Sequence, residues 1–157
     1  MTLPALGILT GISYISGLDY YRGINERFCA DMPQGPLMVP NPPIVMASVD
    51  CDEYVHYLTL GAFDKVAEHI LHGVRKLVAA GCDLLVIASN TGHISVPAIE
   101  QEFPALRILH IADCFAFRLK QRGISNVGLI GTKPTMEEDY LKARLSLHGI
   151  TTVVPAE

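Results

Sequence analysis

The sequence predicts an α/β protein: a three-layer αβα arrangement around a four-stranded parallel sheet, followed by the first βαβ unit of a second, similar domain. Short apolar stretches typical of buried strands alternate along the chain with longer segments in which apolar residues recur at helical spacing. The chain has 157 residues and 50% hydrophobic content, enough to bury a core. Such alternation favours right-handed crossovers, with helices on both faces of the sheet.

The most regular elements lie in the middle of the chain. The clearest helix spans 62–80, where apolar residues recur every three or four positions until Gly81. The next segment, 83–88, is continuously apolar after its first residue, as expected for a strand covered on both faces. The other elements expected before residue 123 are strands at 5–10, 44–49 and 107–111, and helices at 16–30, 96–102 and 113–122.

After Gly123 the pattern begins again. A strand is expected at 127–131, then a capping box that opens with Thr135, a helix at 139–148 and a strand at 150–154. Two strands and one helix are too few to bury their own faces, so a partner chain or further residues should cover part of this surface. The expected domains are 1–123 and an incomplete 124–157, although the later strands could instead extend the first sheet.

Composition excludes several classes of partner. No apolar run reaches the roughly 18 to 20 residues of a membrane span, and residues 1–5 lack the features of a signal peptide. We therefore expect a cytoplasmic protein that does not contact a membrane. A net charge of −4 without a Lys/Arg-rich stripe argues against nucleic acid as a partner. A small ligand fits the composition better.

The four cysteines are widely spaced and never form a Cys-x-x-Cys pair, so neither a zinc site nor a redox dithiol is indicated. We expect reduced thiols. Cys82 and Cys114 are interpreted as small buried packing residues, the usual role of a free cysteine. Cys51 follows Ser48-Val49-Asp50 and is nearer the expected site, but packing is favoured there as well. Cys29 carries no specific expectation.

The most informative stretch is Ser89-Asn90-Thr91-Gly92-His93, which follows the apolar strand at 83–88. Ligands of parallel α/β sheets bind beyond the carboxyl ends of the strands, so Asn90, Thr91 and His93 are candidate binding residues. The alternatives stay open: Asn90 and Thr91 could form a turn that caps the next helix, and His93 could be a surface histidine. His69 and His72, three residues apart on the predicted helix, could suggest a metal pair, but solvated or packed helix residues are preferred.

Other loops add candidate residues. Ser13 follows the first strand and Asp50 the second, and each could cap a helix instead of binding. In the loop 131–135, Thr132 and Lys133 could receive a carboxylate, whereas Thr135 is more simply a helix cap. Neither a Gly-x-Gly-x-x-Gly fingerprint nor a Walker-type loop is present, which disfavours a nucleotide cofactor.

Several of these stretches, in this order, resemble aspartate/glutamate racemases. The resemblance implies two similar α/β domains with the active site between them, no cofactor, an acidic amino acid such as aspartate or glutamate as substrate, and frequently a dimer. It covers nearly the whole chain. The matching stretches are Gly11-Ile12-Ser13-Tyr14, Tyr20-Tyr21-Arg22-Gly23-Ile24-Asn25, Ser48-Val49-Asp50, Ser89-Asn90-Thr91-Gly92-His93, Leu109-His110-Ile111-Ala112-Asp113 and Gly131-Thr132-Lys133-Pro134-Thr135.

The resemblance also implies two proton-transfer cysteines, and this sequence has neither. The first should directly precede Asn90-Thr91, where Ser89 stands. A hydroxyl forms no anion comparable to a thiolate near neutral pH and needs a neighbouring base. The second would belong to a later part of the second domain, beyond this sequence. We therefore expect impaired racemisation, and Ser89 is the expected catalytic position.

Two other functions remain open. The chain could belong to a relative acting on another carboxylated substrate, such as a hydantoin or a maleate-like diacid. It could also be a non-catalytic module, derived from a racemase, that binds a carboxylate or a partner protein. The missing thiol is the feature that favours the non-catalytic interpretation.

Overall fold

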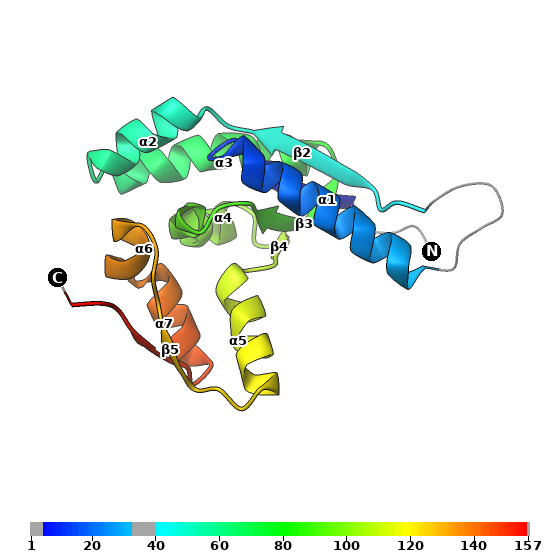
Figure 1. Cartoon of the computed structure of the whole chain (residues 1–157). Helices are drawn as coiled ribbons and strands as arrows, with labels where there is room; N and C mark the ends of the chain where they lie inside the picture. The colour runs from blue at the N-terminus through cyan, green and yellow to red at the C-terminus, as the bar shows by residue number, and fades with distance from the viewer. Residues whose placement is uncertain (1–4, 33–39, 157) are drawn as a thin grey trace. The chain divides into compact units, whose positions relative to one another are not determined.

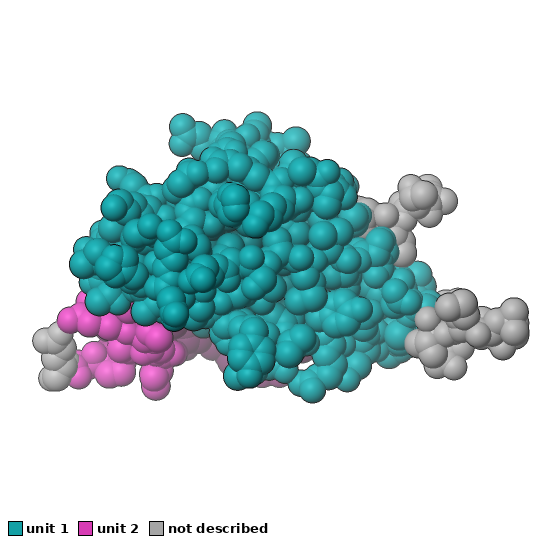
Figure 2. Space-filling view, turned by 90° about the horizontal axis from the view of Figure 1, so that it is seen from above, with its two compact units in different colours: residues 1–108 teal, residues 109–157 magenta. Residues whose placement is uncertain are grey.

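The computed structural model describes residues 5–32 and 40–156, and the predicted α/β class is confirmed. The chain divides into two compact units, residues 1–108 (unit 1) and 109–157 (unit 2), which Figure 2 colours separately. Each unit is described by itself below. None of the helices within the described residues is long and apolar enough to cross a membrane.

Unit 1 contains the predicted four-stranded parallel sheet, in the order β2-β1-β3-β4 (Figure 1). Its strands are β1 (Ala5–Thr10), β2 (Ile44–Ser48), β3 (Cys82–Ile87) and β4 (Arg107–Ile108). The last strand is shorter than predicted because a helix begins at Ile111. The chain passes from β1 to β2 on one side and then to β3 on the other side. This reversal places a topological switch point at the carboxyl ends of β1 and β3.

Helices cover both faces of the sheet. Alternate residues of a strand point to opposite faces, so each central strand packs against helices on both sides. On one face, Ile8 and Val86 pack with residues of α1 (Tyr14–Asp31). On the other face, Leu9 and Leu85 pack with α3 (Phe63–Ala79). The buried side of α3 carries a stripe at helical spacing, as predicted, made of Val66, Ile70, Val74 and Leu77.

One helix of unit 1 was not predicted. The helix α2 (Cys51–Thr59) has nine residues and buries one side chain completely, that of Tyr54, so its apolar period is weak. The side chain of Asp50 accepts a hydrogen bond from the Glu53 amide at 2.9 Å. Asp followed three residues later by Glu is a helix-start signal, which could have revealed this element. A 3₁₀ helix (Thr91–Ser95) and α4 (Val96–Glu102) complete the unit.

Unit 2 contains the predicted βαβ arrangement as a separate two-stranded parallel sheet. The strands therefore do not extend the first sheet, which was the other possibility. Helix α5 packs with α7 around Ala116, Leu141 and Leu145, so the division into compact units falls before α5, earlier than the domain boundary predicted after residue 123. The elements are α5 (Ile111–Gln121), β5 (Asn126–Gly128), α6 (Lys133–Glu137), α7 (Asp139–Leu147) and β6 (Thr151–Val153).

The predicted capping box at Thr135 is wrong. Thr135 lies inside α6 and is buried, while α7 begins after Glu138, whose backbone is extended. The helix starts earlier because Thr132 takes the N-cap position and Pro134 suits a first helical turn.

The cysteine predictions have mixed outcomes. Cys82 is buried, as predicted, and burial raises the pKa of its thiol. Cys114 is exposed, so its predicted packing role is wrong. The buried face of α5 carries Ala112 and Ala116, and the residue midway between them points away from that face.

An ion-pair cluster joins α5 to the end of α7. The guanidinium of Arg144 donates to both carboxylate oxygens of Asp113, at 2.9 and 2.8 Å, and Nε2 of His148 lies 2.8 Å from one of them. Because the carboxylate accepts these bonds in its charged form, chiefly from Arg144, the pKa of Asp113 falls from 3.8 to about 2. The cluster therefore stabilises unit 2 only while Asp113 is ionised.

This geometry predicts an acid-dependent loss of stability. A carboxyl group whose folded pKa is lowered stabilises the fold above its unfolded value, and that contribution disappears as the pH falls from about 4 to about 2. Since Asp113 is about one-third exposed, we expect screening to reduce the contribution to about 1 kcal/mol. Asp113→Asn should lose this increment at pH 7 and approach the parent's stability near pH 2, as measured by denaturant unfolding.

The matched control is Glu26→Gln, which removes an exposed carboxylate from α1. Its unfolding free energy should follow that of the parent across the same pH range. A difference between Asp113→Asn and the parent that stayed constant from pH 7 to pH 2 would contradict the assignment.

Candidate functional site

The candidate site lies at the carboxyl ends of β1 and β3, where the fold has its switch point. Pairing between the strands continues to this edge, since the Ala88 amide donates to the Leu9 carbonyl at 2.9 Å. On the other side of β1, the Val49 amide donates to the Thr10 carbonyl at 2.9 Å. The loops that leave β1, β2 and β3 therefore start from one fixed edge of the sheet.

Gly11 allows two of these loops to lie in contact. Its φ is +101°, in the left-handed region that side chains rarely adopt. A Cβ at this position would overlap the backbone nitrogen and oxygen of Val49 and crowd Oγ of Ser48. The loop after β1 therefore depends on a residue without a side chain.

Ser89 lies two residues after the end of β3 and is half-buried in a short network of hydroxyl and amide groups. Its Oγ accepts from the Gly92 amide at 3.3 Å and lies 3.4 Å from Oγ1 of Thr91. Nδ1 of His93 lies 2.7 Å from the Ser89 carbonyl oxygen. A carbonyl only accepts, so Nδ1 carries the hydrogen and donates it. Ser89 is thus held through both its side chain and its main chain.

The two alternatives for this stretch do not match the structure. His93 is 1% exposed, so it is not a surface histidine. The Asn90 side chain makes no capping hydrogen bond, because its backbone is already helical (φ −64°, ψ −53°) and leads directly into the 3₁₀ helix. Asn90 is exposed and Thr91 is half-buried, and both lie beside Ser89 at the strand end.

Ser13 and Asp50 both take N-cap positions, but only one of them caps through its side chain. Asp50 caps α2, whereas Ser13 precedes α1 without a side-chain capping bond and is exposed. A residue that the sequence did not single out, Ser16, donates to the Ala88 carbonyl at 2.7 Å and ties α1 to the end of β3. A serine in a first helical turn gives no sequence signal for such a contact.

Cys51 does not pack as predicted. It is exposed, and its Sγ donates to the Ile12 carbonyl at 3.1 Å. This bond is a further contact between the loop after β1 and the start of α2.

The candidate residues of unit 2 form their own group. Thr132 and Thr135 share a hydrogen bond between their hydroxyls at 2.9 Å, and the Tyr140 hydroxyl donates to Thr135 at 3.3 Å. Lys133 is exposed, and its Nζ lies 3.5 Å from a Glu137 carboxylate oxygen. Among the residues that the structure describes, no three His, Cys, Asp or Glu side chains are grouped to hold a metal ion.

Comparison with known proteins gives a consistent result. A sequence model of the Asp/Glu/hydantoin racemase family matches residues 9–157. The structure is similar to that of a candidate Asp/Glu racemase from Yersinia pestis, with 33% identity and a TM-score of 0.88 over 99% of this chain and 66% of that one.

Two more distant structures show the same fold. An aspartate racemase homologue from Pyrococcus horikoshii has 24% identity and a TM-score of 0.82, over 99% of this chain and 66% of that one. A glutamate racemase from Aquifex pyrophilus has 17% identity and a TM-score of 0.66, over 96% of this chain and 54% of that one. This chain therefore spans about two thirds, or less, of the length of the structures it matches.

The contact at Gly11 predicts a large cost for a small substitution. Gly11→Ala should lower the free energy of unfolding of unit 1 by about 2–4 kcal/mol, because it combines an unfavourable φ with backbone overlap. Urea unfolding of the full chain measures this difference.

Gly23→Ala provides the control, since a Cβ at that position in α1 would meet nothing within 4 Å. This variant should be more stable than the parent by about 0.5–1 kcal/mol. Equal effects of the two substitutions would show that the Gly11 contact does not constrain the loop.

Proposed function

The chain belongs to the Asp/Glu/hydantoin racemase family, and from this we propose that it binds an acidic amino acid at the carboxyl ends of β1 and β3. The position of Ser89 carries the proposal. It follows β3, which ends at Ile87, at the switch point where a ligand of an open α/β sheet binds, and it is surrounded by small polar groups. By resemblance, this position belongs to the first proton-transfer cysteine of the family.

Racemisation at the α-carbon requires a base that removes the proton and an acid that returns one to the opposite face. A cysteine thiol, with an ordinary pKa near 8.5, supplies a thiolate readily, whereas a serine hydroxyl needs a base beside it. Nδ1 of His93 donates to the Ser89 carbonyl, so this nitrogen is not available to deprotonate the hydroxyl. The proposal is therefore an aspartate/glutamate-racemase-like protein whose catalysis is impaired in this chain.

The substrate contacts follow from chemical type. The exposed amide of Asn90 and the hydroxyl of Thr91 suit a carboxylate, and the Asp50 carboxylate suits an ammonium group. Ser13 completes the proposed contacts in unit 1, and the buried His93 is proposed to support the site through its hydrogen bond to the Ser89 carbonyl. In unit 2 the proposed carboxylate contacts are Thr132 and Lys133, with Thr135 holding the Thr132 hydroxyl.

The proposal also covers the setting of the protein. It needs no cofactor, because thiol or hydroxyl groups and a second acid-base residue are the only chemistry it invokes. We place the protein in the cytoplasm as a homodimer. Sedimentation of the purified chain tests the dimer directly.

A second candidate function is a non-catalytic module that binds a carboxylate or a partner protein. The observation that favours it is the hydroxyl at position 89 in place of a thiol. This candidate and the leading one share a ligand class and differ in turnover, so binding and inversion must be measured separately.

We expect the parent chain to bind L-aspartate or L-glutamate in calorimetry without inverting either one measurably in a chiral assay. Ser89→Cys should introduce exchange of the α-proton with D₂O, because a thiolate at this position can remove that proton from one face. Ser89→Ala is the matched control and should show no exchange.

Asn90→Ala should weaken binding about tenfold, the usual cost of losing a hydrogen bond to a charged ligand.

Three outcomes would count against this proposal. Rapid inversion by the parent would show that Ser89 does not impair catalysis. Absence of binding to both amino acids would remove the substrate class. Equal exchange in the Ser89→Cys and Ser89→Ala variants would show that position 89 does not face the α-carbon.

A further inference from the structure

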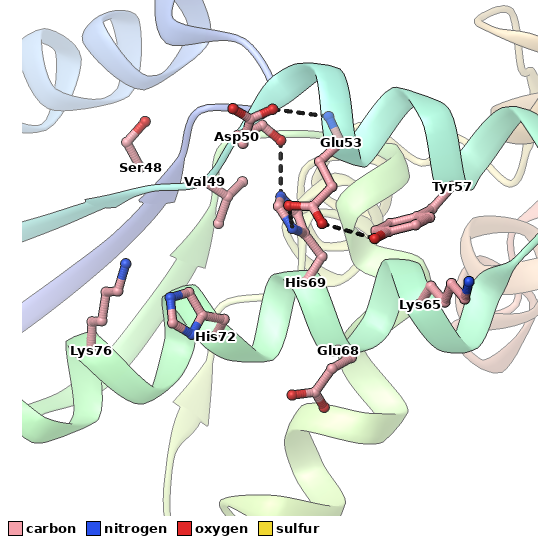
Figure 3. A pocket seen from close by; sticks show the side chains of 10 residues that line it. All are labelled: Ser48, Val49, Asp50, Glu53, Tyr57, Lys65, Glu68, His69, His72 and Lys76. Carbon is pink, nitrogen blue, oxygen red and sulfur yellow. Dashed lines mark hydrogen bonds and ion pairs between the residues drawn. The ribbon is translucent and has the colours of Figure 1, made fainter.

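A cavity beside α2 and α3 of unit 1 shares little with the candidate site. It has a volume of about 660 Å³ and lies between the end of β2, helix α2 and one face of α3 (Figure 3). Sites for small molecules have volumes of about 300–1,000 Å³. Asp50 is the one predicted substrate contact among the described residues that line it. The candidate residues after β1 and β3 do not line this cavity.

We propose that this cavity is a second ligand site, which takes a small anionic metabolite through His72 and Lys76. The inference rests on the cavity alone and does not use the proposed racemase chemistry.

The floor of the cavity is a stripe of basic residues on α3. Lys65, His69, His72 and Lys76 are spaced by four, three and four positions, which places them on one side of a helix. Figure 3 shows these side chains along the cavity-facing side of α3. The opposite stripe of the helix is the apolar one that packs on the sheet.

The acidic side chains of the cavity are already bound within the protein. Glu53 accepts from the Tyr57 hydroxyl at 2.8 Å and pairs with Nδ1 of His69 at 3.2 Å. Asp50 uses one carboxylate oxygen to cap α2, and its carbonyl lies 2.9 Å from Nε2 of His69.

Glu68, the remaining acid, pairs with Arg75, and the pKa of its carboxyl group is lowered chiefly by this pairing and more weakly by the charge of His72. The hydrogen bonds and ion pairs described for these acids are therefore made with groups other than His72 and Lys76.

The side chains of His72 and Lys76 are not held by other groups in this way. Within the described part of the chain, neither side chain makes a hydrogen bond or an ion pair, and both are exposed. Lys65, by contrast, lies 5.5 Å from the centre of the Tyr57 ring. One end of the cavity thus presents two basic groups, while Tyr57 and Val49 supply apolar surface elsewhere.

The separation of basic groups at one end of the cavity from apolar surface elsewhere indicates the class of ligand. An anionic group placed between His72 and Lys76 would receive charge-assisted hydrogen bonds, which are stronger than neutral ones. The remainder of the molecule could lie over Val49 and the Tyr57 ring. A cationic ligand would compete with His69 and Arg75 for carboxylates that are already paired.

Inorganic phosphate is the minimal probe. We expect saturable amide shifts at residues 48–50 and 65–76 when phosphate is added to the labelled full chain at pH 7, with sodium chloride at equal ionic strength as the reference. The double variant His72→Asn, Lys76→Gln should bind at least about tenfold more weakly, because it loses both donors. Thermal unfolding verifies that this variant is folded.

The matched control removes the same two residue types elsewhere. His56→Asn with Lys120→Gln changes net charge equally, and neither residue lines the cavity. This control should bind phosphate as the parent does. Shifts that do not saturate, an unchanged affinity in the cavity variant, or an equal loss in the control would overturn the proposal. Loss of amino-acid binding at β1 and β3 would leave this result unaffected, so the two proposals fail independently.

Discussion

The two-sided confinement of β1 is the constraint on which unit 1 depends. This strand pairs with β2 on one edge and with β3 on the other, and its side chains are buried alternately against α1 and α3. It has no freedom to shift in register, since a one-residue slip would exchange the residues of the two faces. The carboxyl end of the sheet is consequently rigid, and the loops that follow β1 and β3 start from fixed points. Gly11 then brings the first of these loops onto Val49.

Much of this arrangement could be predicted from the sequence, because the apolar pattern of long periodic helices and of continuously apolar strands indicates which residues are buried. Helix α3 and strand β3 are the clearest examples. The failures have physical reasons as well. Helix α2 is short and buries one residue fully, so its period is weak and its only signal was the cap at Asp50. Thr135 begins a capping pattern, but Thr132 and Pro134 start the helix one turn earlier.

The candidate site was predictable in position and less so in detail. Ser89 ends an apolar run, and that change of character identifies a strand end at the sheet edge. The burial of His93 could not be predicted, because it depends on how a short 3₁₀ helix packs against α3, which is distant in sequence. The burial of His93 changes what its ring can do chemically. A surface histidine would be free to exchange protons with solvent, whereas the buried ring uses Nδ1 to fix the Ser89 main chain.

The net charge of the chain and the local arrangement of its charged groups lead to different expectations about ligands. A net charge of −4 argues against polyanionic partners, since long-range attraction depends on the sum over the chain. A small ligand instead experiences the groups that remain unpaired within a cavity. Beside α3, the carboxylates are used by a helix cap, by His69 and by Arg75. Among the described residues, His72 and Lys76 of the basic stripe therefore make no hydrogen bond or ion pair with an acid. An acidic protein can therefore contain a local site for an anion, and the pairing of its acids determines where.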